Sequence, residues 1–270
     1  MQNLSKRIMS VAAAAALAVG LVACGGSSTS ETKTDDATAS SDAVVYKIAT
    51  DTTFAPFEFA DASGTYVGID VELLAAIAED QGFQYELEPL GFDAALQAVQ
   101  SNQSDAVIAG MSITDARKEV FDFSEPYYDS TVCAAVSDAS ITKLEDLKGK
   151  TVAVKTGTMS ESWAESIKDQ YGFTTVQFDT SDVMYQDVLA GNTAACFEDT
   201  PIMTYAISTG NVDLKILSQV DSTSEFATPY GFAVKKGENA ELLAAFNAGL
   251  ATIKSNGTYQ EIIDKYMTFE

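Results

Sequence analysis

Short apolar runs alternate with amphipathic stretches along most of this chain. The run 44–50 has the length and β-branched content of a strand, whereas 68–82 has helical spacing and ends at a glycine. The apolar face expected on that helix consists of Val71, Leu74, Ala75 and Ala78. The alternation continues through strands at 84–90, 105–110, 149–158, 174–179 and 193–199 and helices at 92–102, 160–172 and 181–192. This pattern predicts an α/β protein with largely parallel sheets.

The pattern starts again after Tyr128, and this predicts two lobes. A strand at 131–136 opens a second series, and the chain closes with a strand at 230–237 and helices at 239–257 and 257–267. We expect the closing segment to return to the first series. The predicted domains are lobe 1 at 44–129 plus 230–270 and lobe 2 at 130–229, with hinge segments at 128–131 and 229–231.

The first 43 residues are typical of an export signal followed by a tether. Lys6 and Arg7 precede an apolar, Ala-rich run that ends before Cys24, so residues 1–23 are predicted to be a signal peptide. "LVAC" resembles a bacterial lipobox, in which Cys24 carries the lipid, and 24–43 is too polar to form a core. A soluble secreted protein and an uncleaved anchor helix are the alternatives.

Charge and composition exclude several classes of function. Removing residues 1–23 takes away Lys6 and Arg7, which leaves 14 basic against 39 acidic residues, a formal charge of −25. Such a surface repels nucleic acid and anionic lipid. The absence of histidine excludes histidine triads and histidine zinc sites. Cys133 and Cys196 lie in apolar runs, where they form either a disulfide or, as we favour, two buried thiols.

Polar side chains follow four of the predicted strands directly. In parallel sheets, ligands bind beyond the carboxyl ends of the strands. This criterion selects Asp51, Ser112, Thr158 and Asp199.

The chemistry near these strand ends suits a free amino acid. Arg117 offers a planar, bidentate cation for a carboxylate, and the loops at Ser112 and Thr158 offer backbone N–H groups. Asp199 and the carbonyl of Gly110 can accept from an ammonium. Binding about ten heavy atoms with micromolar affinity needs about 0.8 kcal/mol per atom, which requires nearly complete enclosure. Two closing lobes provide this.

Each residue also has an ordinary structural interpretation. Phe54 and Phe92 are expected to sandwich the ligand side chain, but single phenylalanines more often belong to a core. Ser112 and Asp199 could be helix N-caps, and Arg117 could be a solvated first-turn residue. The convergence of complementary groups on four strand ends favours the binding site.

Six segments in order resemble one protein family: "ATDTTFAPFEF", "GIDVELLAAIAED", "AGMSITDARKEVFDFSEPYY", "AVKTGT", "EDTPIMTY" and "SNGTYQEIIDKY". They are similar to the bacterial extracellular solute-binding proteins for polar amino acids, which are the receptors of ABC importers. The resemblance covers nearly all of 44–270. It implies a two-lobed, type II periplasmic-binding-protein-like fold, with two mostly parallel sheets flanked by helices and a cleft between the lobes.

The resemblance also implies a role for each matching position. Asp51 would read the ligand side chain, and Lys155 matches a site position of glutamine-binding members. Glu198 departs from those members, which have histidine there. If Asp51, Lys155 and Glu198 all face the cleft ionised, the remaining charge of −1 favours a cationic or amide side chain. The predicted ligand-binding residues are Asp51, Phe54, Phe92, Gly110, Met111, Ser112, Arg117, Lys155, Thr158, Glu198 and Asp199.

The expected function is that of a non-catalytic, monomeric receptor without cofactor or metal. It would bind a polar, basic or amide L-amino acid and deliver it to a permease, while a lipid on Cys24 holds it at the outer face of the cytoplasmic membrane. One alternative is a dehydratase for a cyclic carboxylic acid, with Arg117 on the carboxylate and Glu198 as general acid. Another is an amino-acid sensor without transport.

Overall fold

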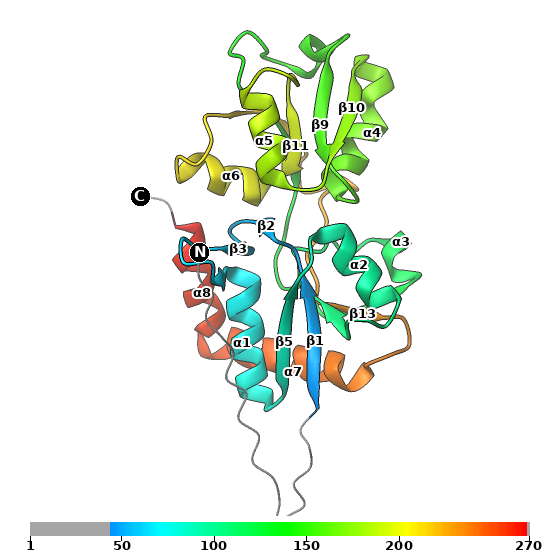
Figure 1. Cartoon of the computed structure of the whole chain (residues 1–270), viewed down its shortest axis with the longest axis vertical. Helices are drawn as coiled ribbons and strands as arrows, with labels where there is room; N and C mark the ends of the chain where they lie inside the picture. The colour runs from blue at the N-terminus through cyan, green and yellow to red at the C-terminus, as the bar shows by residue number, and fades with distance from the viewer. Residues whose placement is uncertain (1–43, 269–270) are drawn as a thin grey trace, which may run out of the picture. The chain divides into compact units, whose positions relative to one another are not determined.

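The computed structural model describes residues 44–268. The segments interpreted as signal peptide, lipidated Cys24 and tether therefore lie outside the described residues. Two five-stranded sheets, each flanked by helices, form two lobes, and a separate three-stranded sheet is built from β2 (Thr53–Phe54), β3 (Glu58–Ala60) and β4 (Tyr66–Val67) (Figure 1).

The first lobe contains the sheet with β1 (Val45–Thr50), β5 (Gln84–Pro89), β6 (Ala106–Val107), β7 (Phe121–Phe123) and β13 (Ala233–Lys235). Its helices are α1 (Ile69–Gln81), α2 (Phe92–Gln100), α3 (Asp115–Lys118), α7 (Ala240–Asn256) and α8 (Thr258–Met267). The second lobe contains β8 (Val132–Val136), β9 (Thr151–Lys155), β10 (Thr174–Phe178), β11 (Cys196–Asp199) and β12 (Lys215–Gln219). Its helices are η1 (Leu144–Leu147), α4 (Met159–Tyr171), α5 (Ser181–Leu189) and α6 (Thr200–Ser208).

Both large sheets have the same strand order. The first is β5-β1-β6-β13-β7 and the second is β10-β9-β11-β8-β12. In each, the fourth strand is the first one formed after the chain crosses from the other lobe, and it pairs antiparallel with both neighbours. The other four strands of each sheet run in one direction. Their carboxyl ends therefore lie together at one edge, where a binding site is expected.

The sequence predicted most of these elements but missed some details. The small sheet of β2, β3 and β4 was not expected, and neither were β7 and β12. Each large sheet is mixed, because only half of its pairings are parallel. The predicted apolar face of α1 was also displaced. The helix buries Ile69, Leu73, Leu74, Ile77 and Ala78, whereas Ala75 is exposed, because α1 packs against α7, α8 and the short strands β3 and β4.

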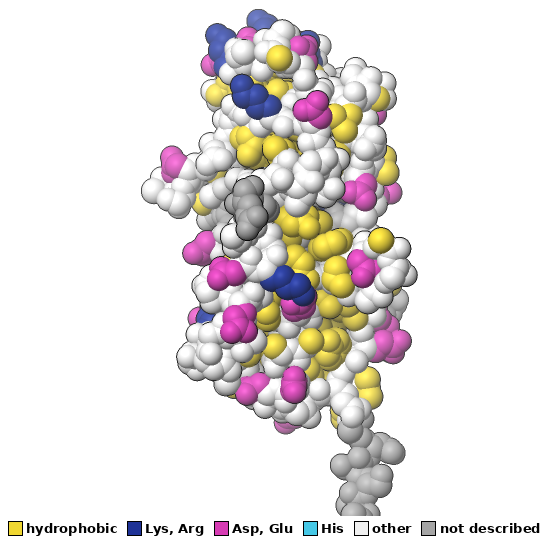
Figure 2. Space-filling model, turned by 90° about the vertical axis from the view of Figure 1, so that its left-hand side faces the viewer, with side chains coloured by type: hydrophobic (Ala, Val, Ile, Leu, Met, Phe, Trp, Pro, Cys, Tyr) yellow, Lys and Arg dark blue, Asp and Glu magenta, His cyan; other side chains and the backbone are white. Residues whose placement is uncertain are grey.

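Apolar side chains cover both faces of each sheet. Consecutive residues of β1, Ile48 and Ala49, belong to separate clusters on opposite faces of the first sheet. In the second sheet, Val152 and Ala153 divide in the same way. Cys133 and Cys196 are free and buried in the cluster beneath α5, which agrees with their interpretation as small apolar residues. Figure 2 shows acidic side chains spread over the face that it draws, in agreement with the negative net charge.

The two segments that cross between the lobes pair with each other. The N–H group of Tyr230 donates to the carbonyl of Tyr128 at 2.7 Å, and Tyr230 also forms an isolated β-bridge with Ser112. The Tyr128 and Tyr230 rings stack with centroids 6.0 Å apart. The crossings therefore form one short aromatic connection directly behind the loop that follows β6.

A pair of buried carboxyl groups supports that loop. Glu58 on β3 and Asp70 on α1 are both fully buried. Asp70 Oδ2 accepts hydrogen bonds from the N–H group of Gly110 and the Tyr127 hydroxyl, both at 2.8 Å. Burial raises the pKa of Asp70 to about 6, and burial together with the charge of Asp70 raises the pKa of Glu58 well above its usual value. The pair therefore retains a proton at neutral pH.

The retained proton makes stability depend on pH. Glu58 is protonated in the folded state but ionised in the unfolded chain, so folding takes up a proton above the ordinary pKa of glutamate. The free energy of unfolding should therefore fall by about 1.4 kcal/mol per pH unit as the pH rises toward the folded pKa of Glu58. We predict that Glu58→Gln flattens this slope at pH values above the ordinary pKa of glutamate, as measured by urea unfolding.

The matched control is Glu79→Gln, which makes the same substitution at an exposed position of α1. It should retain the wild-type slope. Equal slopes for wild type and Glu58→Gln would show that Glu58 carries no proton in the folded protein.

Candidate ligand-binding site

The strand ends selected from the sequence meet at one cavity. Asp51 follows β1, Ser112 follows β6, Thr158 precedes α4 after β9, and Asp199 ends β11. The complete lining is Asp51, Phe54, Phe92, Gly110, Ser112, Arg117, Lys155, Thr158, Met159 and Asp199. Residues of both lobes therefore contribute, and Met159 is the one lining residue that was not predicted.

Two predicted residues do not line the cavity. Met111 is fully buried in the core beneath α2. Glu198 points away from the cavity, and its carboxylate accepts from the hydroxyls of Ser181 and Tyr185, each at 2.8 Å, and from the N–H group of Asp199. Successive side chains of a strand point to opposite faces, and this explains why neighbouring Asp199 reaches the cavity while Glu198 does not.

Arg117 is held from both lobes. Its backbone N–H donates to the hydroxyl of Thr114, which caps α3. In the side chain, Nη1 donates to the Ser112 carbonyl at 2.8 Å and Nη2 donates to the Gly157 carbonyl at 2.9 Å. The guanidinium carbon lies 5.3 Å from the Phe92 ring centroid. Burial lowers the pKa of Arg117 to about 10, partly opposed by the charge of Asp199, so the group remains cationic at neutral pH.

Asp51 and Lys155 form a buried ion pair across the lobes. Each side chain is 1% exposed, and Lys155 Nζ contacts Asp51 Oδ2 directly. The second carboxylate oxygen of Asp51 accepts from the N–H group of Thr52 at 2.6 Å, and Lys155 Nζ lies 4.9 Å from the Phe54 ring centroid. This part of the cavity therefore combines a hydrogen-bond donor and an acceptor with no net charge.

Asp199 presents one free oxygen. Its Oδ2 accepts from the Tyr230 hydroxyl at 2.5 Å, whereas Oδ1 is buried and has no hydrogen-bond partner among the described residues. Burial raises the pKa of Asp199 to about 7, and the charge of Glu198 adds to the rise. Hydrogen bonding by Tyr230 and the positive charge of Arg117 act in the opposite direction. A buried acceptor of this kind suits an ammonium group.

Backbone geometry allows the cavity walls to approach closely. Gly110 has φ +51, and a Cβ atom there would lie 2.4 Å from Cε1 of Phe54. Only glycine therefore lets the Phe54 ring lie against this turn. Thr158 is the N-cap of α4, where its hydroxyl accepts from the N–H group of Glu161. The partial positive charge of the α4 N-terminus consequently lies beside the cavity.

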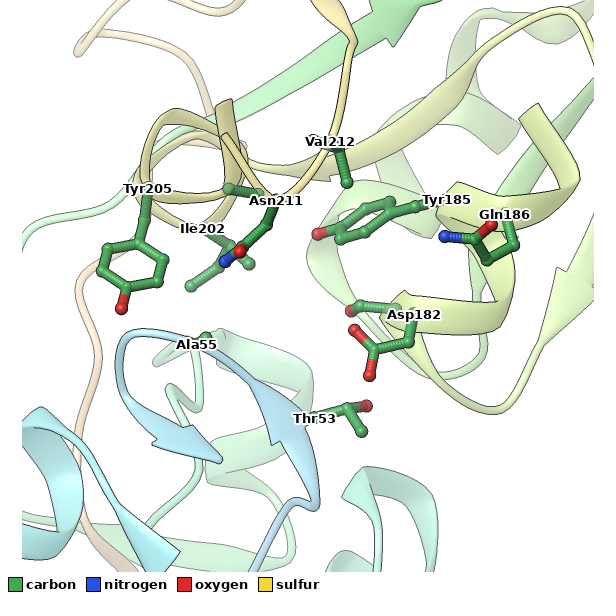
Figure 3. A pocket seen from close by; sticks show the side chains of 11 residues that line it. Thr53, Ala55, Asp182, Tyr185, Gln186, Ile202, Tyr205, Asn211 and Val212 are labelled. Carbon is green, nitrogen blue, oxygen red and sulfur yellow. The ribbon is translucent and has the colours of Figure 1, made fainter. Parts of the chain in front are cut away.

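Another hollow, with a volume of about 300 Å³, is lined by Ser181 and Tyr185, the two residues whose hydroxyls donate to Glu198. Figure 3 shows Thr53 and Ala55 of the first lobe opposite Asp182, Tyr185 and Asn211 of the second. The described residues that line it include acidic Asp182 but no lysine or arginine. It therefore lacks the cation that a carboxylate ligand requires, and the cavity with Arg117 fits an amino acid better.

The described part of the chain shows neither a metal site nor a membrane span. No group of three or more cysteine, aspartate or glutamate side chains within 44–268 is arranged to hold a metal ion. Among the helices of the same range, none is long and apolar enough to cross a bilayer.

The sequence missed three features of this site. Tyr230 was considered only as part of a hinge segment, yet its hydroxyl holds Asp199. Glu58 and Asp70, which support Gly110, were not considered. Asp70 lies in the "GIDVELL" segment, where a charged residue within an apolar stretch was the available signal.

A family model and individual relatives both place this chain among the bacterial solute-binding proteins. The model of the bacterial extracellular solute-binding proteins, family 3, matches residues 46–269. The Lysine/arginine/ornithine-binding periplasmic protein of Escherichia coli (strain K12) is 32% identical over 228 residues, covering 83% of this chain and 87% of that protein.

Two solved proteins extend the comparison. Lactococcus lactis GlnP substrate binding domain 2, in open conformation, is 44% identical, with 83% of this chain and 95% of that chain covered and a TM-score of 0.58. An ancestral arginine-binding protein is 37% identical. Bound to arginine, it has a TM-score of 0.75 and covers 83% of this chain and 98% of that chain. For its glutamine-bound structure the TM-score is 0.73, and the comparison covers 82% of this chain and 97% of that chain. With the family model matching residues 46–269, this chain belongs to the bacterial extracellular solute-binding proteins, family 3.

Proposed function

We propose that this protein is the substrate-binding component of an ABC importer that binds a free polar, basic or amide L-amino acid between its lobes. The observation that carries the proposal is that a cation and a carboxylate, Arg117 and Asp199, line one cavity from different lobes. The names of the relatives support it, since they bind lysine, arginine, ornithine or glutamine. The protein then delivers its ligand to a permease.

The two charged ends of an amino acid find matching groups. The α-carboxylate binds the guanidinium of Arg117 next to the N-terminus of α4. Two of the five guanidinium N–H donors have carbonyl acceptors within the described residues, so the others remain for a carboxylate. The α-ammonium donates to Asp199 Oδ1. Phe54 and Phe92 pack on the ligand stem.

The pair of Asp51 and Lys155 favours an amide side chain within this class. Glu198 does not line the cavity, so the side-chain end carries one negative and one positive charge rather than an excess of −1. An amide can donate its NH₂ to Asp51 and accept from Lys155, which keeps both buried charges paired. A guanidinium or ammonium side chain would have to displace Lys155 from Asp51. We therefore place glutamine ahead of arginine and lysine.

Binding requires opening and closure of the lobes. The cavity volume is about 10 Å³, close to the space that one water molecule needs. Direct contacts cross it, such as Arg117 to Gly157 and Lys155 to Asp51. The higher TM-score with the arginine-bound relative than with the open one, despite lower identity, supports a closed state. A ligand then shifts an open–closed equilibrium, and the closed form engages the permease.

The remaining assignments follow the sequence and the family. We divide the protein into lobe 1 at 44–129 plus 230–270 and lobe 2 at 130–229, supported by the inclusion of β13 in the first sheet. Residues 1–23 direct export, and a lipid on Cys24 with the tether 24–43 holds a monomer at the outer face of the cytoplasmic membrane. We assign no catalytic activity. The buried free oxygen of Asp199 suits an ammonium, which the keto-acid substrate of a dehydratase lacks.

The first prediction concerns the carboxylate clamp. Arg117→Ala leaves the ligand carboxylate without its cation, and losing one partner of a buried charge pair costs about 2–5 kcal/mol. We therefore expect L-glutamine or L-arginine, whichever binds tighter to wild type in a calorimetric screen of the twenty amino acids, to bind at least about 30-fold more weakly. Lys118→Ala, at the neighbouring exposed position of α3, should retain wild-type affinity. Undiminished binding by Arg117→Ala would refute the clamp.

The second prediction concerns the ligand side chain. Lys155→Gln removes the cation beside Asp51, so a cationic ligand gains a free carboxylate partner. We expect the affinity ratio of L-arginine to L-glutamine to rise by at least about tenfold, which corresponds to about 1.4 kcal/mol. Lys168→Gln breaks a surface pair with Glu165 and should leave the ratio unchanged. If the Lys155 variant also leaves it unchanged, the Asp51–Lys155 pair does not read the side chain.

A further inference from the structure

Tyr230 connects the lobe crossings to the proposed ammonium acceptor. It lies on the second crossing and is fully buried. Its hydroxyl donates to Asp199 Oδ2 at 2.5 Å and accepts from the Ser130 hydroxyl, on the first crossing, at 2.9 Å. Ser130, Tyr230 and Asp199 thus form a hydrogen-bonded chain that ends at the cavity.

The ring of Tyr230 is fixed on several sides. It packs edge-to-face on Phe57 with centroids 5.1 Å apart, and it stacks on Tyr128. It also lies 6.4 Å from the Phe54 ring, which lines the cavity. The position of the hydroxyl is therefore determined by the aromatic cluster of the first lobe, although the carboxylate it binds belongs to the second.

We propose that Tyr230 is a positioning residue for α-ammonium recognition, which holds Asp199 by one oxygen so that the other faces the ligand. The inference rests on the proposed function. It assigns Tyr230 no direct contact with the ligand. The hydroxyl occupies Oδ2 and fixes the carboxylate plane, and this leaves Oδ1 as the oxygen available to an ammonium.

The charge environment of Asp199 supports this role. Burial raises its pKa to about 7, and the hydrogen bond from Tyr230 lowers it. Removing the hydroxyl should therefore raise the pKa of Asp199 and leave less of the ionised form at neutral pH. The titratable and charged groups that face Asp199 from the elements around it are Glu198, Arg117, Lys155, Tyr230 and the Cys133 thiol.

The test compares ligands with and without an α-amino group. Calorimetry on wild type and Tyr230→Phe uses L-glutamine and glutaramic acid, which is glutamine without that group. If arginine is the tighter ligand, L-arginine and 5-guanidinopentanoic acid replace them. We expect Tyr230→Phe to bind the amino acid about tenfold more weakly, equivalent to about 1.4 kcal/mol. Binding of the deamino analogue should stay unchanged.

The pH profile gives a second readout. Ammonium binding needs ionised Asp199, so wild-type affinity should rise through about pH 7. In Tyr230→Phe, the midpoint of this rise should move to higher pH. Ser130→Ala removes the hydroxyl that donates to the Tyr230 hydroxyl and, at 3.2 Å, to the Thr131 carbonyl. It should move the midpoint less and in the same direction, because a Tyr230 hydroxyl that no longer accepts from Ser130 is a weaker donor to Asp199.

Tyr185→Phe is the matched control. Tyr185 is also a buried tyrosine whose hydroxyl donates to a carboxylate, but its partner Glu198 does not line the cavity. It should retain the discrimination between the amino acid and its analogue.

Three results would overturn the inference. Equal weakening of both ligands by Tyr230→Phe would indicate a purely structural role, and unchanged binding of both would remove any role. Wild type that binds none of the twenty amino acids would instead refute the proposed function, and the inference with it.

Discussion

A charge that leaves water must find a partner, and this requirement governs the cavity between the two sheets. Lys155 and Asp51 form an ion pair with each other, and the guanidinium of Arg117 donates hydrogen bonds to one carbonyl group of each lobe. In Asp199, one carboxylate oxygen accepts from Tyr230, whereas the other has no hydrogen-bond partner among the described residues. Under the proposed function, the unpaired oxygen of Asp199 accepts a hydrogen bond from the positively charged ammonium group of the ligand. The other charged groups already have partners across the cavity, Arg117 at Gly157 and Lys155 at Asp51. An arriving ligand replaces these contacts with its own.

The same requirement explains which residues the sequence could predict. Asp51, Ser112, Thr158 and Asp199 were found because strand ends can be located from apolar runs, and parallel strands bring those ends together. Glu198 could not be placed, since a shift of one residue along β11 decides whether a side chain faces the cavity or Ser181 and Tyr185. The partnership of Tyr230 with Asp199 joins residues 31 positions apart across two lobes. The order of apolar and polar residues along the chain carries no information about such a contact.

Elements were predicted well where local pattern dominates and poorly where packing does. The strands and helices of both lobes follow apolar periodicity, whereas the small sheet of β2, β3 and β4 consists of very short strands without any. The apolar face of α1 was displaced because α7, α8 and the short strands β3 and β4 share its surface. Glu58 looks like an ordinary surface carboxyl in the sequence, and the apolar stretch around Asp70 does not show which groups it contacts. Only the fold reveals that they are enclosed together behind Gly110.

The position of β13 affects the order in which the chain can fold. It lies between β6 and β7, so the first sheet lacks an interior strand until residues 233–235 have been made. The second sheet is assembled from one continuous stretch, β8 to β12. During synthesis, which proceeds from the N-terminus, the later-encoded sheet therefore has all its strands before the earlier one does. Until then β6 has an unpaired edge, which the partly folded chain has to keep from pairing with neighbouring molecules.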